Sequence, residues 1–177
     1  MKKRVAILIS GGGSNMLQLV KSMGDDHPAH PVLVLSNNPN AAGIERARNL
    51  GIETKTLDHR PFGKDRAKFE FELDKILCAF HVDIICLAGF MRVLTVDFVM
   101  RWEGLMLNGH PSLLPFYKGL NTHARAIEAG DESGGCSVHI VTADLDGGPL
   151  LGQVKVAIKP NDTCLLYTSD AADDRNC

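Results

Sequence analysis

Residues 5–9, VAILI, form an uninterrupted apolar run that ends at Ser10 and a stretch of glycines. A strand whose side chains are all apolar must be buried on both faces, which happens mainly in parallel sheets covered by helices on both sides. Similar runs occur at residues 32–35 and 83–88. Between these runs, apolar residues recur with the spacing of a helix. The sequence therefore predicts an α/β fold with a mainly parallel sheet flanked by helices.

The remaining elements follow from the same patterns. Helices are expected at residues 16–23, 41–50, 69–80, 95–100 and 122–129, with Thr95 as an N-cap and Gly130 as a C-terminal stop. Further strands are expected at residues 54–57, 106–107, 138–142 and 154–158. No internal repeat, linker or domain boundary interrupts this alternation, so we expect a single domain over residues 1–163.

The composition narrows the classes of function. The chain of 177 residues carries a formal charge of -2, which gives no electrostatic reason to propose binding to nucleic acid or to an anionic membrane. Its five cysteines are an odd number without C-x-x-C spacing, so neither a disulfide framework nor a zinc site is indicated. Cys78 and Cys86 lie in apolar stretches and are expected to pack as small hydrophobic residues. The first apolar run is too short for a signal peptide or a membrane span, so we expect a cytoplasmic protein.

Residues 164–177, CLLYTSDAADDRNC, show no amphipathic period. Their first part matches the translation of a common transposase sequencing adapter, and a natural polar C terminus is the ordinary alternative. We interpret the segment as an artefactual tail and exclude it from the fold prediction. On this interpretation the natural sequence is interrupted at about Thr163.

The loop at residues 10–15, SGGGSN, lies between a predicted strand and a predicted helix. Such a loop can direct backbone N–H groups at an anion. A dinucleotide fingerprint would require glycine where Met16 stands, and a nucleotide P-loop would require Gly-Lys-Ser/Thr. A plain turn with ordinary N-capping is the remaining alternative. A phosphate-monoester site formed by Gly13, Ser14 and Asn15 fits the pattern best.

Two later segments, LNGHPSLLP at 107–115 and CSVHIVTADLDGGP at 136–149, carry groups suited to chemistry at a carbonyl carbon. Asn108 can donate its amide N–H to an oxyanion, and His110 projects to the same side if the segment is extended. Asp146 lies in a glycine-rich turn that can bring its carboxylate beside His110 and orient the imidazole for proton transfer.

Other kinds of site fit less well. Taken singly, each of these residues could be an ordinary surface, capping or turn residue. The histidines lack H-E-x-x-H or comparable metal-ligand spacing, and the G-x-S-x-G of serine hydrolases is absent. Cys136 could be a nucleophile with His139, but strand alternation puts Ser137 and His139 on the face opposite Cys136. We therefore expect His139 to be packed in the core or behind the catalytic residues, and His123 to cap a helix or face solvent.

In combination these segments resemble one enzyme family. Over residues 3–160 the chain carries, in order, ISGGGSNM, AGIERA, LAGFMRVL, LNGHPSLLP, KGLNTH, CSVHIV and LDGGP. The pattern resembles the phosphoribosylglycinamide formyltransferases, which have a Rossmann-like formyltransferase fold. Formyltetrahydrofolate hydrolases and methionyl-tRNA formyltransferases share part of it and are the close alternatives, but GSN at 13–15 resembles the loop that holds the ribonucleotide phosphate. An inactive nucleotide- or folate-binding module is an alternative of another class, against which the retention of Asn108, His110 and Asp146 argues.

The resemblance implies transfer of a formyl group from 10-formyltetrahydrofolate, the cosubstrate, to the amine of glycinamide ribonucleotide in the de novo synthesis of the purine IMP. It implies no metal, its partners are small molecules, and it leaves the oligomeric state open. The catalytic residues that it implies are Asn108, His110 and Asp146. The residues implied for folate are Arg66, Met91, Arg92, Val93, Leu94 and Asn108, and those for the ribonucleotide are Gly13, Ser14, Asn15 and Pro111.

The chain departs from the family pattern in three respects. Gly109 stands where a bulky aliphatic residue is usual, which removes packing from the segment that carries His110. Gly134 replaces a common histidine. The family also uses a lysine and a glutamate from a C-terminal segment that has no counterpart here. We therefore expect this chain to bind the nucleotide weakly and to have low activity.

Overall fold

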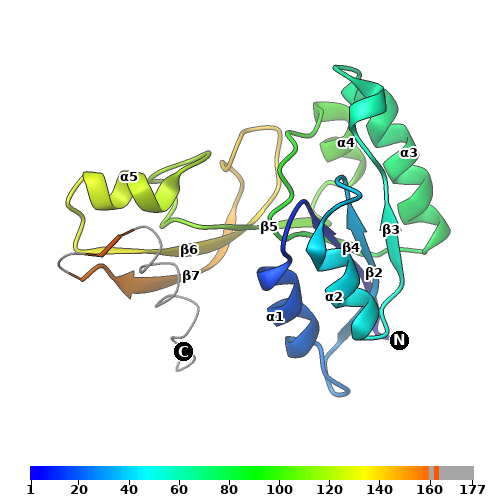
Figure 1. Cartoon of the computed structure of the whole chain (residues 1–177), viewed down its shortest axis with the longest axis horizontal. Helices are drawn as coiled ribbons and strands as arrows, with labels where there is room; N and C mark the ends of the chain where they lie inside the picture. The colour runs from blue at the N-terminus through cyan, green and yellow to red at the C-terminus, as the bar shows by residue number, and fades with distance from the viewer. Residues whose placement is uncertain (160–161, 164–177) are drawn as a thin grey trace. The chain divides into compact units, whose positions relative to one another are not determined.

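The central strand β1 (Lys3–Ile9) has residues Val5 to Ile9 almost entirely withdrawn from solvent. It is flanked by β2 (Ala29–Ser36) and β4 (Ile84–Leu87), and both pair with it in parallel. The computed structural model describes residues 1–159 and 162–163 and is drawn in Figure 1. The buried parallel strands predicted from the apolar runs are confirmed.

The chain divides into two compact units, Met1–Leu107 and Asn108–Cys177. Strand β5 (Met106–His110) begins in the first unit and ends in the second. The strand order of the first unit is β3 (Thr54–Thr56), β2, β1, β4 and β5, and that of the second is β5, β6 (Ser133–Ile140) and β7 (Leu150–Ala157). Strands β6 and β7 are antiparallel. The predicted α/β class with a mainly parallel sheet is confirmed.

The helices follow the predicted apolar stripes. Those of the first unit are α1 (Ser14–Ser22), α2 (Ala42–Asn49), α3 (Arg66–Ala79) and α4 (Val96–Arg101), with a short 3-10 helix at Arg60–Phe62, and the second unit contains α5 (Thr122–Glu128). Met16 of α1 and Ile44 of α2 pack with β1 in one hydrophobic cluster. Thr95 caps α4 by accepting the N–H of Phe98, as predicted. Gly130, with a φ of 73°, follows the end of α5.

Helix α3 buries Phe69, Leu73 and Leu77 on one face, which confirms the predicted stripe. The expectation that Cys78 packs as a hydrophobic residue was wrong, because Cys78 is exposed. It comes one residue after the buried Leu77, so the helix turns its side chain away from the buried face. Cys86 on β4 behaves as predicted, and its burial raises the pKa of the thiol to about 11.

The strands of the second unit are longer than the sequence predicted. Strand β6 begins at Ser133 rather than at residue 138, because Gly134 and Gly135 give no apolar signal. A side chain at Gly135 is excluded, since its Cβ would lie 2.0 Å from the carbonyl oxygen of Val154 on β7. Strand β5 continues through residues 108–110, so two of the proposed catalytic residues lie on a strand.

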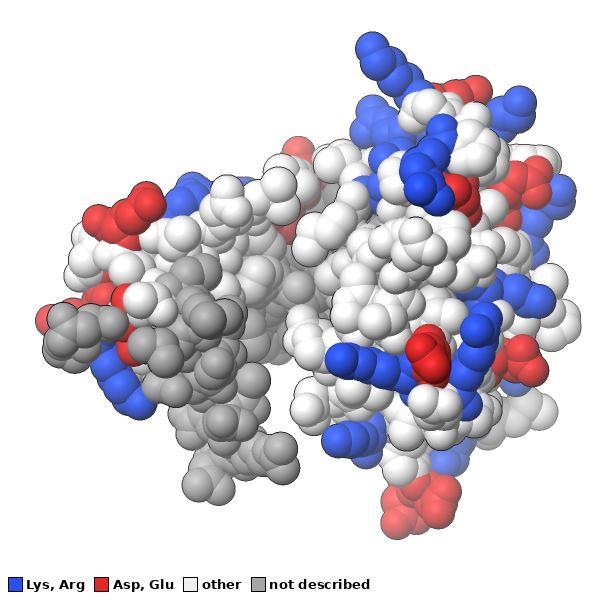
Figure 2. All heavy atoms as spheres, viewed as in Figure 1, with Lys and Arg blue, Asp and Glu red and all other residues white. Residues whose placement is uncertain are grey.

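No helix in the described part of the chain is long and apolar enough to cross a membrane. Basic and acidic side chains are interspersed over the face of the first unit that Figure 2 shows.

The segment 164–177, which is predicted to be an artefactual tail, lies outside the described residues.

Gly109 provides a test of the strand that carries the proposed catalytic residues. It is exposed on β5, and a Cβ built there would meet nothing within 4 Å. Gly109→Val should raise the free energy of unfolding by about 0.5–1 kcal/mol, because glycine is entropically costly in a strand and valine favours the extended backbone. Urea unfolding measures the change. Gly135→Ala is the matched control and should lower the same free energy, and a loss of stability in Gly109→Val would contradict the described environment.

Candidate functional site

The carboxylate of Asp146 brings together the residues that the sequence singled out for catalysis. Its Oδ2 lies 3.4 Å from Nδ1 of His110, and its Oδ1 lies 3.5 Å from Nδ2 of Asn108. Asn108 and His110 are two positions apart on β5 and therefore project to the same side. The side chains of His110 and Asp146 are only 6% and 8% exposed. The second unit thus contains a buried cluster of an amide, an imidazole and a carboxylate.

Both ring nitrogens of His110 face hydrogen-bond acceptors. Nε2 lies 3.0 Å from the carbonyl oxygen of Tyr117, and Nδ1 faces the Asp146 carboxylate. Carbonyl and carboxylate oxygens can only accept, so each nitrogen can hydrogen-bond there only while it carries a hydrogen. A neutral ring has one N–H and can serve only one of the two acceptors.

Tyr117, whose carbonyl holds His110, is itself fixed by its side chain. Its hydroxyl donates to Oδ2 of Asp131 at 2.7 Å, and this hydrogen bond raises the pKa of the Tyr117 hydroxyl. The guanidinium of Arg125 lies 5.2 Å from the centre of the Tyr117 ring. The orientation of His110 therefore depends on α5 and the loop before β6, which the motif around His110 does not reveal.

His139 on β6 lies behind the cluster. It is only 2% exposed, and its Nδ1 lies 2.9 Å from the carbonyl oxygen of Ile140. In a neutral ring Nδ1 then carries the hydrogen, so Nε2 can accept from Nδ2 of Asn108, which lies 3.1 Å away. His139 thus orients the Asn108 amide, as its expected place behind the catalytic residues suggests. The exposed position of Cys136 on the opposite face confirms the predicted alternation.

The turn that carries Asp146 is held in a specific conformation. Asp146 has a φ of 46°, in the left-handed region that non-glycine residues seldom adopt. Its Oδ2 accepts the backbone N–H of Gly119 at 2.9 Å. Gly148 is required for close packing, because a Cβ there would lie 1.8 Å from the carbonyl oxygen of Ile140. The glycines of this turn therefore permit a close approach, while the strained backbone conformation falls on Asp146 itself.

Ser137 fixes the segment that follows His110, and sequence reasoning gave it no role. Its buried hydroxyl donates to the carbonyl oxygen of Ser112 at 2.6 Å and accepts the N–H of Leu114 at 3.0 Å. Gln153 on β7 donates from Nε2 both to this hydroxyl and to the carbonyl oxygen of Leu114. These bonds join β6 and β7 to the loop after β5. Only the period-two burial of β6 hinted that Ser137 faces inward.

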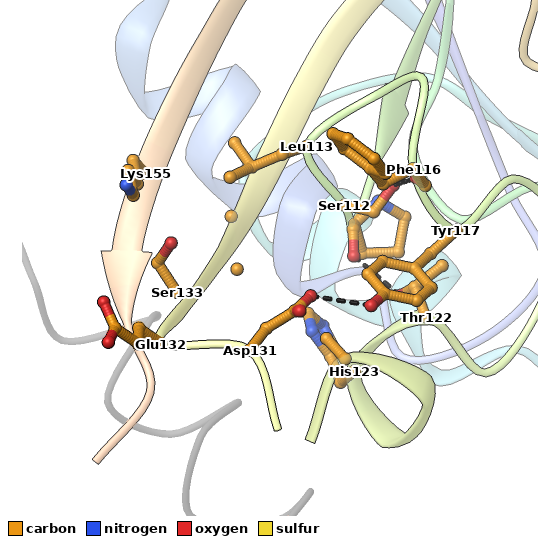
Figure 3. A pocket seen from close by; sticks show the side chains of 14 residues that line it. Ser112, Leu113, Phe116, Tyr117, Thr122, His123, Asp131, Glu132, Ser133 and Lys155 are labelled. Atoms are coloured by element: carbon orange, nitrogen blue, oxygen red, sulfur yellow. Dashed lines mark hydrogen bonds between the residues drawn. The ribbon is translucent and has the colours of Figure 1, made fainter. Parts of the chain in front are cut away.

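Pro111, expected at the ribonucleotide, lines a cavity of about 480 Å³ in the second unit. Figure 3 shows this cavity, with the Tyr117 hydroxyl directed at Asp131 and the His123 ring beside them. His123 is half-buried rather than fully solvated. Burial lowers the pKa of its imidazole, and electrostatic repulsion from His110 lowers this pKa further. Asn108, His110 and Asp146 do not line this cavity.

The glycine loop forms a second cavity, of about 290 Å³, in the first unit. It is lined by Ser10, Gly11, Gly12, Gly13, Ser14, Asn15, Ala88, Gly89 and Met91. Gly13 is the N-cap of α1 with a φ of 75°, and no side chain caps this helix end. The first N–H groups of α1 are therefore arranged as in the anion sites of helix N-termini. Gly13, Ser14 and Asn15, which are predicted to bind the phosphate, all line this cavity.

Gly43, in the AGIERA segment, explains why α2 can approach this loop. Its N–H donates to the carbonyl oxygen of Gly11 at 3.1 Å. A Cβ on Gly43 would lie 2.5 Å from Cδ1 of Ile9 and 2.9 Å from the Gly11 carbonyl oxygen. The loop and α2 therefore fit only while position 43 has no side chain.

Residues 91–94, expected to bind folate, form an extended loop in the first unit. Met91 and Val93 are 65% and 62% exposed. Nη1 of Arg66, at the start of α3, donates to the carbonyl oxygen of Val93 at 3.4 Å. The guanidinium of Arg92 lies 5.7 Å from the centre of the Phe69 ring. Arg66 and this loop, which are far apart in the sequence, thus lie in contact.

Comparison with known sequences adds an independent finding. Residues 3–174 match the family model described as formyl transferase. A protein of Escherichia coli (strain K12) named phosphoribosylglycinamide formyltransferase is 44% identical over 171 residues, which cover 96% of this chain and 76% of that protein. The trifunctional purine biosynthetic protein adenosine-3 of Bos taurus is 46% identical over 163 residues, or 92% of this chain. The chain spans only 16% of the length of that trifunctional protein.

Solved structures agree with these sequence relatives. The crystal structure of phosphoribosylglycinamide formyltransferase from Brucella melitensis superimposes with a TM-score of 0.91 at 40% identity, covering 97% of this chain and 88% of that one. The enzyme of the same name from Coxiella burnetii, in complex with CHES, gives a TM-score of 0.90 at 40% identity over 97% of this chain and 81% of that one.

Within the described residues, no group of three or more His, Cys, Asp or Glu side chains could hold a metal ion.

Gly43 tests the packing of the glycine loop. Gly43→Ala should lower the free energy of unfolding by about 1–3 kcal/mol, because the new methyl group overlaps the Gly11 carbonyl and the Ile9 side chain. Chemical denaturation measures it. Gly24→Ala, where a Cβ meets nothing within 4 Å, is the control and should change stability by no more than about 0.5 kcal/mol. Equal stability of the two variants would show that the loop does not require glycine at position 43.

Ser137 tests the anchoring of the loop after β5. Ser137→Ala leaves the N–H of Leu114 without its buried acceptor, and should cost about 1–3 kcal/mol of unfolding free energy. The neighbouring exposed position serves as control, and Cys136→Ala should stay within about 0.5 kcal/mol of the parent. If thermal and urea unfolding place both variants alongside the parent, Ser137 does not anchor the loop.

Proposed function

We propose that this chain, which belongs to the formyl transferase family, transfers a formyl group from 10-formyltetrahydrofolate to the amine of glycinamide ribonucleotide. The observation that carries the proposal is the buried contact of Asp146 with His110 and Asn108. The names of the relatives from Escherichia coli and Brucella melitensis point to the same reaction. The product would enter purine synthesis.

The reaction is an acyl transfer without oxidation or reduction. The amine nitrogen of the ribonucleotide attacks the formyl carbon, so a new C–N bond forms and the carbonyl oxygen becomes an oxyanion. N–H groups of Asn108 and His110 stabilise that charge, which is the usual task of such donors in a buried site. The bond from carbon to N10 of the folate then breaks, and the proton lost by the amine is returned to N10. Asp146, through the imidazole or a water molecule, supports this proton movement.

The hydrogen bonds in the structure constrain which N–H groups can serve the oxyanion. Nε2 of His110 is 3.0 Å from the Tyr117 carbonyl, so a substrate oxygen must share or replace that contact. One N–H of Asn108 is directed at His139. The other faces Asp146 at 3.5 Å, which is a long and therefore weak hydrogen bond. A substrate oxygen can therefore accept from this second N–H with the smallest loss of existing hydrogen bonding.

The substrate-binding roles follow the resemblance and the local geometry of each unit. Residues 13–15, at the N terminus of α1, present backbone N–H groups suited to the ribonucleotide phosphate. The loop 91–94 offers exposed apolar side chains for the flat rings of the folate, and Arg66 adds a positive charge beside it. Asn108 would also adjoin the folate, and Pro111 would contact the ribonucleotide.

Removal of the proposed catalytic groups tests the function. In an assay of tetrahydrofolate formation, His110→Ala, Asn108→Ala and Asp146→Asn should each lower kcat about 10²- to 10³-fold, the usual loss on removal of one oxyanion donor or its support. The parent should require glycinamide ribonucleotide for any turnover. Cys136→Ala, on the opposite face of β6, is the matched control and should keep the activity of the parent.

Two results would contradict the proposal. Turnover of 10-formyltetrahydrofolate at the same rate with and without the ribonucleotide would indicate a hydrolase. Full activity in His110→Ala would place the chemistry elsewhere in the protein.

A further inference from the structure

Glu70 is a carboxylate of the first unit that the site described above does not use, yet it is only 4% exposed. Its Oε1 accepts the backbone N–H of Thr95 at 2.8 Å, and its Oε2 accepts the Thr95 hydroxyl. No ion pair of Glu70 with a basic side chain occurs among the residues that the structure describes. A carboxylate buried without a cation is costly, so these two hydrogen bonds and the positive N-terminal end of α4 must compensate for its lost hydration.

Thr95 is the joint between the loop 91–94 and helix α4. Its hydroxyl oxygen accepts the N–H of Phe98 and so begins the helix. Its backbone N–H, which Glu70 holds, belongs to the peptide unit that ends the loop. Glu70 therefore fixes both the last peptide of the loop and the hydroxyl that starts the helix.

One face of α3 contacts the loop at Arg92 and Val93 and holds Thr95 beyond it. Residues 66, 69 and 70 are three and four positions apart and lie side by side on the helix. Arg66 donates to the Val93 carbonyl, and Phe69 lies beneath the Arg92 guanidinium. Glu70, which is 4% exposed, completes the row through its hydrogen bonds to Thr95.

The loop is also held at its other end. The N–H of Met91 donates to Oγ of Ser10 at 2.7 Å. The Ser10 hydroxyl in turn donates to Oδ1 of Asn37, a side chain that is 3% exposed. Polar side chains therefore fix the backbone at both ends of a segment with no regular secondary structure: Ser10, backed by the buried Asn37, at one end and the buried Glu70 at the other.

The side chains of this segment do not explain why its backbone is fixed so firmly. Met91 and Val93 are 65% and 62% exposed, so the loop buries little apolar surface of its own. A rigid backbone that presents apolar side chains to solvent is what a preorganised ligand surface requires. If the contacts served packing alone, we would expect these two side chains to be buried.

We infer that Glu70 is a positioning residue for folate: through Thr95 it holds the loop 91–94 in the conformation that binds the formyl donor. The inference rests on the proposed function, because it takes that loop as the folate-binding segment. Glu70 acts on the ligand only through Thr95 and is not a catalytic residue.

Glu70→Gln tests the inference, with Glu72→Gln as the matched control. Glu72 lies on the same helix, has a side chain that is 40% exposed and pairs with Lys75, so its substitution removes the same charge without touching the loop. The dissociation constant for tetrahydrofolate, measured by calorimetry, should rise about tenfold in Glu70→Gln and stay unchanged in Glu72→Gln. The KM for glycinamide ribonucleotide should remain within about twofold of the parent. Amide hydrogen exchange at residues 91–95 should become faster in the protein without ligand.

A second pair of variants keeps the test informative if Glu70→Gln unfolds. Thr95→Val removes the hydroxyl that Glu70 accepts, whereas Thr95→Ser retains it. Weakened tetrahydrofolate binding in the valine variant and recovery in the serine variant would support the role of Glu70. Combining Thr95→Val with Glu70→Gln should add little further loss, because both changes remove the same contact.

The outcomes separate this inference from the proposed function. If the parent binds tetrahydrofolate and Glu70→Gln binds it equally well with unchanged exchange at 91–95, the inference is overturned and the proposed function stands. If the parent binds no tetrahydrofolate, both are overturned. A selective loss in Glu70→Gln with the parent KM for the ribonucleotide supports both.

Discussion

A single buried carboxylate organises the second unit. Asp146 faces His110 and Asn108, and it accepts the backbone N–H of Gly119 at 2.9 Å. Withdrawing a carboxylate from water is costly unless several donors replace the lost hydration. The imidazole of His110, the amide of Asn108 and the N–H of Gly119 therefore all face the Asp146 carboxylate, which sets their positions relative to one another. His139, which orients the Asn108 amide, extends the same network into the strand β6.

The two units fix their polar groups and loops in place by different interactions. In the second, a left-handed backbone conformation at Asp146 and the close packing at Gly148 set the carboxylate in place. In the first, irregular loops are held by polar side chains, among them the buried Glu70 and the partly buried Ser10. Both arrangements spend folding free energy on fixing groups that do not pack, which is the expected signature of sites built to bind or react.

The sequence predicted most of the fold because its strongest signals are local. The run at residues 5–9, short and ended by Ser10 and glycines, indicates a strand buried on both faces, and the apolar stripe on α3 indicates one face of a helix. The start of β6 was missed because Ser133 and the two glycines after it have no apolar side chains to reveal a strand. The exposure of Cys78 was missed because an apolar neighbourhood in sequence does not specify which face of the helix a residue occupies.

The proposed catalytic residues were recognisable because their motifs lie in short continuous segments. The residues that hold them were not, since each depends on a partner distant in the sequence. Tyr117 supports His110 through its backbone carbonyl, which any residue type possesses. Ser137 and Glu70 look like ordinary strand and helix residues until their buried partners, Leu114 and Thr95, are known.

Whether the formyl carbon passes to an amine or to water is decided by following that carbon through the reaction. The protein would be supplied with 10-formyltetrahydrofolate carrying ¹³C in the formyl group, together with glycinamide ribonucleotide, and the products followed by ¹³C NMR. For a formyltransferase we expect the label to appear in the formamide of the ribonucleotide in step with tetrahydrofolate formation. Label released as free formate would contradict it.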